Sequence, residues 1–246
     1  QYHDQPILKN VSRRDVLKGI VTGGGLVVAA QFVPTAIAAY DPYPTGATGM
    51  PGGMVWDPQV YVSIAKDGTV TIVSHRSEMG TGSRPSLPMV VADEMEADWS
   101  KVKIVQAPGD EAKYGNQDTD GSRSVRHFIQ PMRACGAAMR QMLESAAALK
   151  WSCSDTEVRA ENHKVVHIPS GQSLSYGDLA EAASKLPTPK ARVIALKDPS
   201  KFRYIGKGNV QIIDLHDITT GKATYAQDVV VPGMKFGAAE VARCPE

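Results

Sequence analysis

Residues 77–99 read SEMGTGSRPSLPMVVADEMEADW, a glycine turn that leads directly into residues with helical apolar spacing. Gly80 and Gly82 allow the backbone to take positive φ and to bring its N–H groups close to a ligand. A helix that begins after such a turn presents unpaired N–H groups and the positive end of its dipole to an anion. Plain loop geometry is the alternative, because GTGSRPS lacks the third glycine of a dinucleotide motif and the Gly-Lys-Ser/Thr ending of a P-loop.

The whole chain narrows the class of protein. Its 246 residues are enough for one large domain or two ordinary ones. Twenty-seven basic and 26 acidic residues leave a net charge of +1, so no overall field attracts nucleic acid or an anionic membrane. Cys135, Cys153 and Cys244 are scattered without a C-x-x-C pair, which excludes a self-contained iron–sulfur or zinc site of ordinary spacing. Any iron–sulfur cluster is therefore expected on a partner chain.

Residues 1–39 have the pattern of an export signal. The segment SRRDVLK at 12–18 precedes an apolar run, and Ala36-Ile37-Ala38 offers a small-residue cleavage site. This pattern predicts export to the periplasm by the twin-arginine route, which moves proteins already folded, often with a cofactor in place. Two alternatives stay open: a basic pair before a short buried helix, and an uncleaved signal that attaches the protein to the inner membrane.

Downstream of a Pro- and Gly-rich linker at 40–56, the sequence predicts strands and helices in alternation. The expected elements are strands at 61–64, 70–73 and 102–105, helices at 86–98, 126–150 and 175–184, and a hairpin over 158–168. Residues 107–124 have no apolar periodicity, and a polar loop of that length inside a compact domain is typically functional or mobile. His163 and His167 fall in the hairpin and are interpreted as surface or packing residues. Prolines and lysines at 186–207 predict a linker, and residues 208–246 read as the beginning of another domain, with a turn and two strand-like runs.

Three segments resemble one protein family when they are taken in order: SEMGTGSRPSLPMVVADEMEADWSKVKIVQAP, YGNQDTDGSRSV, and RYIGK with DITTGKATYAQDVVVPGM. They are similar to molybdenum hydroxylases of the isoquinoline 1-oxidoreductase beta-subunit type, within the xanthine dehydrogenase and aldehyde oxidase superfamily. The resemblance implies an α+β fold. A mixed sheet-and-helix molybdopterin-binding domain over 57–185 and a linker over 186–207 are followed by the start of an α/β hammerhead domain over 208–246.

The resemblance also implies the residues that bind the cofactor. The family's Glu-Met-Gly-Gln-Gly turn corresponds to residues 78–82, with Thr81 replacing an amide by a hydroxyl. A Thr-x-x-Ser-x-Ser pattern that holds pyrophosphate and pterin corresponds to residues 119–124. The expected cofactor-binding residues are Met79, Gly80, Thr81, Gly82, Thr119, Gly121, Ser122, Arg123, Ser124 and Gln130. The alternative for the second loop is an Asx-type turn, in which Asp118, Asp120 and Ser122 cap their own backbone.

The chemistry implied by the resemblance is hydroxylation of an aldehyde or N-heterocycle with oxygen from water. The expected cofactor is molybdenum–molybdopterin in its cytosine dinucleotide form, with a [2Fe–2S] small subunit and a haem c cytochrome as partner chains. No segment matches the family's catalytic glutamate motif, so this base is expected beyond residue 246, on the rest of the large subunit or on a second chain. Glu78, Glu94 and Glu96 are not assigned to that role, and no metal ligand is predicted.

Two other classes of protein remain as alternatives. One is a non-catalytic assembly or interaction subunit that retains the fold, which the exchange at Thr81 and the missing base favour. The other is a periplasmic module that binds phosphate or a nucleotide with the two polar loops.

Overall fold

The computed structural model describes residues 56–238, so the predicted export signal and nearly all of the linker after it lie outside the described part of the chain. The chain divides into two compact units, one reaching Val210 and the other beginning at Gln211. Within residues 56–238, no helix combines the length and the apolar character that a membrane span requires.

The first unit contains a mixed three-stranded sheet with the order β1-β2-β3. Strands β1 (Val62–Ile64) and β2 (Val70–Ser74) form the expected antiparallel hairpin, and Asp67 accepts the N–H of Thr69 within its turn. Strand β3 (Val102–Gln106) pairs with β2 in parallel. A parallel pair needs a crossover connection, and the helix that follows β2 provides it. The short helix α3 (Pro58–Tyr61) precedes β1.

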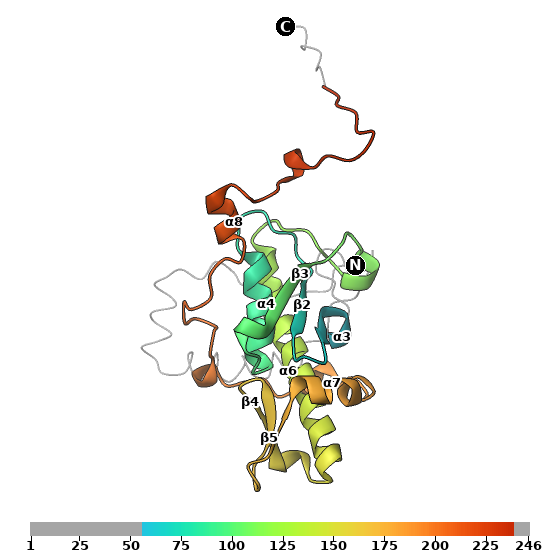
Figure 1. Ribbon diagram of the computed structural model, residues 1–246, viewed down its shortest axis with the longest axis vertical. Helices are drawn as coiled ribbons and strands as arrows, with labels where there is room; N and C mark the ends of the chain where they lie inside the picture. Colours follow the sequence, from blue (N-terminus) through green and yellow to red (C-terminus); the bar gives the residue numbers. More distant parts are fainter. Residues whose placement is uncertain (1–55, 239–246) are drawn as a thin grey trace, which may run out of the picture. The chain divides into compact units, whose positions relative to one another are not determined.

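Two helices form the body of this unit. Helix α4 (Ser83–Glu94) and helix α6 (Arg123–Trp151) lie side by side, with α4 against β2 and β3 (Figure 1). The helix predicted at 86–98 therefore begins and ends earlier than expected. Gly82 at φ 75° starts it directly after the glycine turn, and Glu96 takes a positive φ of 57° just beyond its end. Pro88 is consequently inside the helix and buried, not in its first turn.

The predicted hairpin at 158–168 is confirmed as part of a second, antiparallel sheet. It comprises β4 (Val158–Glu161), β5 (Lys164–His167) and β6 (Ser173–Ser175). Helix α7 (Tyr176–Ser184) follows, with a reciprocal capping box between Ser175 and Asp178. His163 is buried in the hairpin turn, where one ring nitrogen lies 2.8 Å from the carbonyl of Gly68 and the other accepts the N–H of Asp98. This histidine thus joins the two sheets.

Residues 186–207, predicted as a linker, are held against the first unit. They include the short turns η4 (Ala191–Val193) and η5 (Pro199–Lys201). The Lys197 ammonium is buried and lies 2.8 Å from a carboxylate oxygen of Asp93 in α4, and Arg133 in α6 donates to the Lys197 carbonyl. The proline and lysine content of this segment predicts a solvent-exposed linker. The structure differs because Lys197 is buried and forms ion pairs within the fold. The domain limits themselves stay a prediction.

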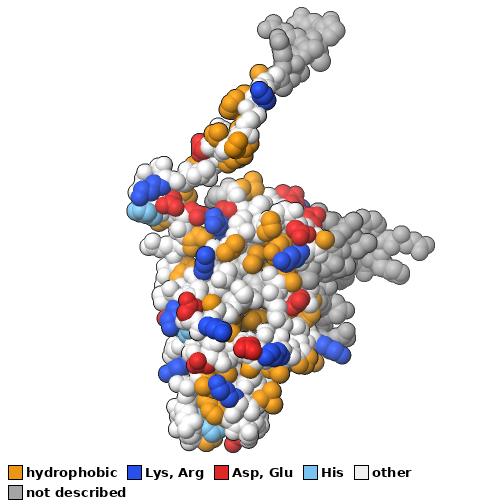
Figure 2. Space-filling model, turned by 45° about the vertical axis from the view of Figure 1, so that its right-hand side comes forward, with side chains coloured by type: hydrophobic (Ala, Val, Ile, Leu, Met, Phe, Trp, Pro, Cys, Tyr) orange, Lys and Arg blue, Asp and Glu red, His pale blue; other side chains and the backbone are white. Residues whose placement is uncertain are grey.

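The second unit contains α8 (Leu215–Thr220) and the turn η6 (Ala226–Asp228). No strand occurs within residues 211–238, so the two strand-like runs predicted there are wrong for this unit. Strands require a neighbour for their N–H and C=O groups, and these residues provide none. Val230 is 78% exposed and Phe236 is 86% exposed, and apolar side chains lie uncovered along this segment in Figure 2.

Candidate cofactor-binding site

The two loops singled out by the sequence meet in one cavity of the first unit. Its volume is about 400 Å³. The residues that line it are Met79, Thr81, Ser83, Thr119, Asp120, Gly121, Ser122, Ser124 and Val125. Six of the ten predicted cofactor-binding residues are in this lining. Gly80 and Gly82 belong to the same turn, whereas Arg123 and Gln130 lie on α6 outside the lining.

Hydrogen bonds fasten one loop to the other. The N–H of Ser77 donates to the carbonyl of Gln117 at 2.9 Å, and the Thr119 hydroxyl donates to the Ser77 carbonyl at 2.6 Å. The Thr119 and Ser124 hydroxyls lie 2.8 Å apart. Two of the predicted hydroxyl ligands therefore maintain the shape of the second loop. Residues 111–114 of that loop form the short helix α5 (Glu111–Tyr114).

A buried arginine that the sequence motifs do not include supports both loops. The Arg76 guanidinium is fully buried, donates from Nε to Ser124 Oγ at 3.2 Å and from Nη1 to the Asn116 carbonyl at 2.7 Å, and lies 3.5 Å from Asp118. Its Cζ is 4.4 Å from the ring centroid of Phe128. Burial lowers the pKa of Arg76 to about 10, an effect that Asp118 opposes, so the group stays cationic at neutral pH. In the sequence, only its position between strand β2 and the glycine turn could have indicated that Arg76 belongs to the site.

His75, the neighbour of Arg76, is buried and neutral. Burial lowers the pKa of its imidazole to about 3. Its ring packs edge-on against Tyr61 and Phe128, with centroid distances of 5.4 and 4.9 Å. Neither ring nitrogen has a hydrogen-bond partner among the described residues, so His75 acts in this structure as a packing group.

The glycine turn already contains an anion, the carboxylate of Glu78. One oxygen accepts the N–H groups of Gly80 at 2.7 Å and Gly82 at 3.0 Å, and the other accepts that of Arg84 at 2.9 Å. Burial raises the pKa of Glu78, but these backbone N–H groups outweigh burial and hold it below its ordinary value. The expectation that Gly80 and Gly82 donate N–H groups to a bound phosphate therefore differs from the structure, in which Glu78 is their acceptor.

The same glycines leave room for a ligand on their other side. A Cβ added to Gly80 or Gly82 would meet nothing within 4 Å. Both have positive φ, at 92° and 75°, so the turn depends on glycine for its backbone conformation. The Cα face of both glycines is therefore open to a ligand.

The N-terminus of α6 offers a site for negative charge, because the side chain of its N-cap residue makes no hydrogen bond to the N–H groups of the first turn. Ser122 takes the left-handed conformation at φ 57° and makes no capping hydrogen bond. Ser122 is exposed and lines the cavity at the start of a 29-residue helix, whose first N–H, that of Arg123, donates to the Asp120 carbonyl at 2.9 Å. Such a helix end stabilises negative charge.

Arg123, predicted as an anion ligand, has carboxylate partners in the structure. Its guanidinium pairs with Asp118 and Asp120. The hydrogen bond from Arg123 lowers the pKa of Asp120. These two carboxylates are therefore directed to the arginine. The Asx-turn alternative, in which they cap their own backbone, expected a different arrangement. Gln130, farther along α6, has a buried side-chain oxygen without a hydrogen-bond partner among the described residues.

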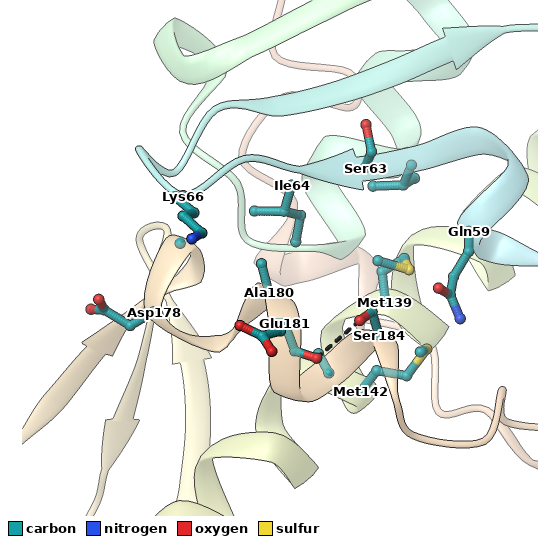
Figure 3. A pocket seen from close by; sticks show the side chains of 13 residues that line it. Gln59, Ser63, Ile64, Lys66, Met139, Met142, Asp178, Ala180, Glu181 and Ser184 are labelled. Carbon is teal, nitrogen blue, oxygen red and sulfur yellow. Dashed lines mark hydrogen bonds between the residues drawn. The ribbon is translucent and has the colours of Figure 1, made fainter.

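A larger cavity of about 510 Å³ lies elsewhere, between β1, α6 and α7, and contains none of the predicted residues (Figure 3). Its carboxylates already have partners: Asp178 caps Ser175, and Glu181 pairs with Lys185. The Ser184 hydroxyl donates to the Glu181 carbonyl at 2.9 Å. The cavity between the two loops is thus the better candidate site, although it is the smaller one.

The residues around the loop cavity fit an anionic group with polar edges. The N-terminus of α6, which has no side-chain cap, the hydroxyls of Thr81 and Ser122 in the lining, and the cation of Arg76 favour negative charge. The carboxylate of Asp120 in the lining is an acceptor for an N–H donor. The phosphate and amino groups of a pterin cofactor offer both kinds of partner.

Comparison with known proteins agrees with this fit. Residues 22–225 match the family model of the molybdopterin cofactor-binding domain. The chain is 30% identical to the beta subunit of isoquinoline 1-oxidoreductase from Brevundimonas diminuta, over 96% of this chain and 34% of that protein. It is 35% identical to a membrane-bound aldehyde dehydrogenase (pyrroloquinoline-quinone) of Gluconacetobacter polyoxogenes, over 76% of this chain and 24% of that protein.

A third relative is the B subunit of nicotinate dehydrogenase from Pseudomonas putida, 27% identical over 93% of this chain and 18% of that protein. The chain thus spans about a third or less of the length of these relatives. The family model covers most of the chain and both loops of the candidate site. The chain therefore belongs to the molybdopterin cofactor-binding domain family.

Proposed function

We propose that this chain is the cofactor-binding part of a molybdenum hydroxylase that oxidises an aldehyde or an N-heterocycle. The single observation that carries the proposal is the cavity in which the two predicted loops meet at the uncapped N-terminus of α6. Support for the substrate class comes from the relatives, whose names describe oxidation of isoquinoline, an aldehyde and nicotinate. When bound, the molybdenum group supplies the redox chemistry.

The residues of this chain bind and orient the cofactor. The Ser122 hydroxyl and the N–H groups that follow Arg123 in the first turn of α6 donate to a phosphate, and Thr81 offers a hydroxyl from the facing loop. Thr119 and Ser124 keep the second loop in place through their mutual contact and the bond to Ser77. Arg76 holds Ser124 from below and adds positive charge that the surrounding protein shields from water.

The finer parts of the proposal extend beyond the described residues. We place the catalytic base on sequence beyond residue 246 and the cofactor in its cytosine dinucleotide form. Electrons pass to a [2Fe–2S] subunit and then to a cytochrome c. Export by the twin-arginine route, which residues 1–39 support, places the enzyme in the periplasm.

A non-catalytic assembly subunit is the second candidate, and one observation favours it. Glu78 fills the glycine turn with the chain's own carboxylate, as expected for a turn that has lost its ligand. The two functions differ in whether the intact enzyme contains a pterin that depends on Ser122.

Replacing Ser122 with aspartate tests the proposal, with Ser122→Asn as its neutral twin. Aspartate and asparagine both tolerate the left-handed conformation, and Ser122 makes no capping hydrogen bond that they would lose, so neither is expected to weaken α6. Two like charges about 4 Å apart repel by about 4 kcal/mol at an effective dielectric constant of about 20. We therefore expect Ser122→Asp to lower the pterin content of the purified multi-subunit enzyme by about tenfold or more, while Ser122→Asn retains most of it.

Pterin is measured by fluorescence after oxidation, and molybdenum by elemental analysis. Equal pterin content in the two variants would contradict the placement of the phosphate at α6. The absence of pterin from the wild-type enzyme as well would favour the assembly subunit.

A further inference from the structure

Three side chains with metal-binding atoms gather at the opposite end of α6 from the loop cavity. They are Cys153, Glu157 and His167, and the thiol sulfur, a carboxylate oxygen and a ring nitrogen all lie within 4.8 Å of one another. Neither the predicted cofactor site nor the proposed function uses any of them. Cys153 is a free cysteine.

Each of the three comes from a separate, well-defined piece of backbone. Cys153 follows the C-cap of α6, where Ser152 is left-handed at φ 55° and the Cys153 N–H donates to the Ala148 carbonyl at 3.0 Å. Glu157 ends the turn η3 (Asp155–Glu157), in which its side chain accepts the N–H of Ser154 at 2.9 Å. The backbone therefore brings the thiol and the carboxylate together without any change of fold.

The register of the hairpin adds the histidine. Val158 in β4 pairs with His167 in β5, and the Ile168 N–H donates to the Glu157 carbonyl at 2.8 Å. The imidazole also contacts the ring of Trp151 at the end of α6, with a centroid distance of 5.4 Å. Helix end and hairpin thus fix the position of this ring from two sides.

A hydrogen bond leaves one nitrogen of the imidazole available. Nδ1 of His167 lies 2.7 Å from the Ser170 hydroxyl, which occupies that nitrogen and leaves Nε2 for a ligand. When a metal-binding histidine donates its other N–H to an oxygen, the ring keeps the required tautomer and orientation. The negative end of the α6 dipole, which lies at the same place, favours a cation.

We propose that Cys153, Glu157 and His167 bind one Zn²⁺ ion, with water as the fourth ligand. A thiolate, an imidazole and a carboxylate are the ligand types that zinc prefers. Tetrahedral zinc with bonds of about 2.0 to 2.3 Å separates its ligand atoms by about 3.5 Å. The three ligand atoms lie within 4.8 Å of one another, so a bound ion draws them closer and joins the end of α6 to the β4–β5 hairpin.

Titration of the chelator-treated full-length protein with Zn²⁺ alone tests the site, read by calorimetry. We expect Cys153→Ser and His167→Gln each to remove one zinc ion from the wild-type stoichiometry. Ser170→Ala keeps all three ligands but frees the ring, so zinc binding is expected to weaken by about 10-fold to 100-fold. His216→Gln, an exposed histidine of the second unit, is the matched control and is expected to leave binding unchanged.

Thermal unfolding provides a measurement independent of stoichiometry. Because the ion binds the folded hairpin and helix end together, Zn²⁺ is expected to raise the Tm of the wild-type protein and of His216→Gln but not that of Cys153→Ser. A spectrum with Co²⁺ in place of Zn²⁺ should show a thiolate-to-metal absorption band that Cys153→Ser lacks. Wild-type zinc binding in Cys153→Ser and His167→Gln, or no zinc binding by the wild-type protein, would overturn the proposal.

Discussion

Gly136→Ala is expected to destabilise the fold, although alanine is the better helix former by about 1 kcal/mol. Gly136 lies where α6 crosses α4. A Cβ at this position would be 2.5 Å from the carbonyl oxygen of Val91, 3.0 Å from the Val91 Cα and 2.9 Å from the Glu94 Cβ. The first two of these atoms are backbone, so the helices must separate, and overpacking of this kind costs about 1 to 3 kcal/mol or more.

Denaturant unfolding of the full-length chain measures the effect, and Gly109→Ala is the matched control. A Cβ at Gly109 would meet nothing within 4 Å, so this variant is expected to unfold at the wild-type midpoint. The sign of the change is decisive, because helix propensity and packing predict opposite signs at Gly136. A Gly136→Ala protein as stable as the wild type would contradict the close approach of the α4 and α6 backbones at this position.

Asp93→Ala is expected to destabilise the fold by weakening the packing of residues 197–205 against α4. The Asp93 carboxylate is fully buried and accepts the N–H groups of Arg203, Tyr204 and Ile205 as well as a bond from Lys197. Lys197 keeps Glu96 at 2.6 Å, but the N–H groups of Arg203, Tyr204 and Ile205 lose their acceptor. Each buried group left without a partner costs about 1 to 3 kcal/mol. Asp198→Ala in the same segment removes only an exposed cap and is expected to cost much less.

The effect of Asp93 depends on pH in a defined direction. Burial raises the pKa of Asp93, but the N–H groups of Ile205 and Tyr204 together with Lys197 lower it further, so it lies below its ordinary value. Its stabilising contribution is therefore complete above the unfolded pKa of about 4 and is lost as the pH falls through the folded value. The difference in unfolding free energy between wild type and Asp93→Ala should be large at pH 7 and shrink below about pH 4. A difference that does not vary with pH would contradict this role for Asp93.

Local patterns predicted the elements of the first unit well, because each carries its own signal. The turn residues Asp67 and Gly68 predict the first hairpin, and Ser175 with Asp178 predicts the capping box of α7. The α+β class is confirmed on these elements. The early start of α4 escaped prediction, since Gly82 can precede a helix as well as belong to a longer loop.

Long-range pairing explains what the sequence did not reveal. The composition of residues 186–207 matches a solvated linker, and only the fold brings Lys197 to Asp93, more than a hundred positions earlier in the chain. Arg76 and Glu78 likewise appear as ordinary charged residues until the loops close around them. The proposed zinc site contains no cysteine pair that the sequence would show. Its histidine is brought beside the other two ligands by the register of β4 and β5, which the sequence alone does not define.

The candidate site was predictable in part, as a pair of loops and not as a set of contacts. The glycine turn and the Thr-Ser loop do meet in one cavity, as the resemblance implies. The roles within it are different, because Glu78 takes the N–H groups of Gly80 and Gly82 and Arg123 is paired with two aspartates. The uncapped end of α6 at Ser122 is left as the place for an anion.

We propose above all that this chain holds a molybdenum–pterin cofactor in its loop cavity. Its most direct test is elemental and pterin analysis of the complete enzyme, purified gently from its native host with every co-purifying chain identified by mass. We expect stoichiometric molybdenum and pterin, both retained in Ser122→Asn and lost in Ser122→Asp. An intact complex that contains this chain and neither molybdenum nor pterin would contradict it.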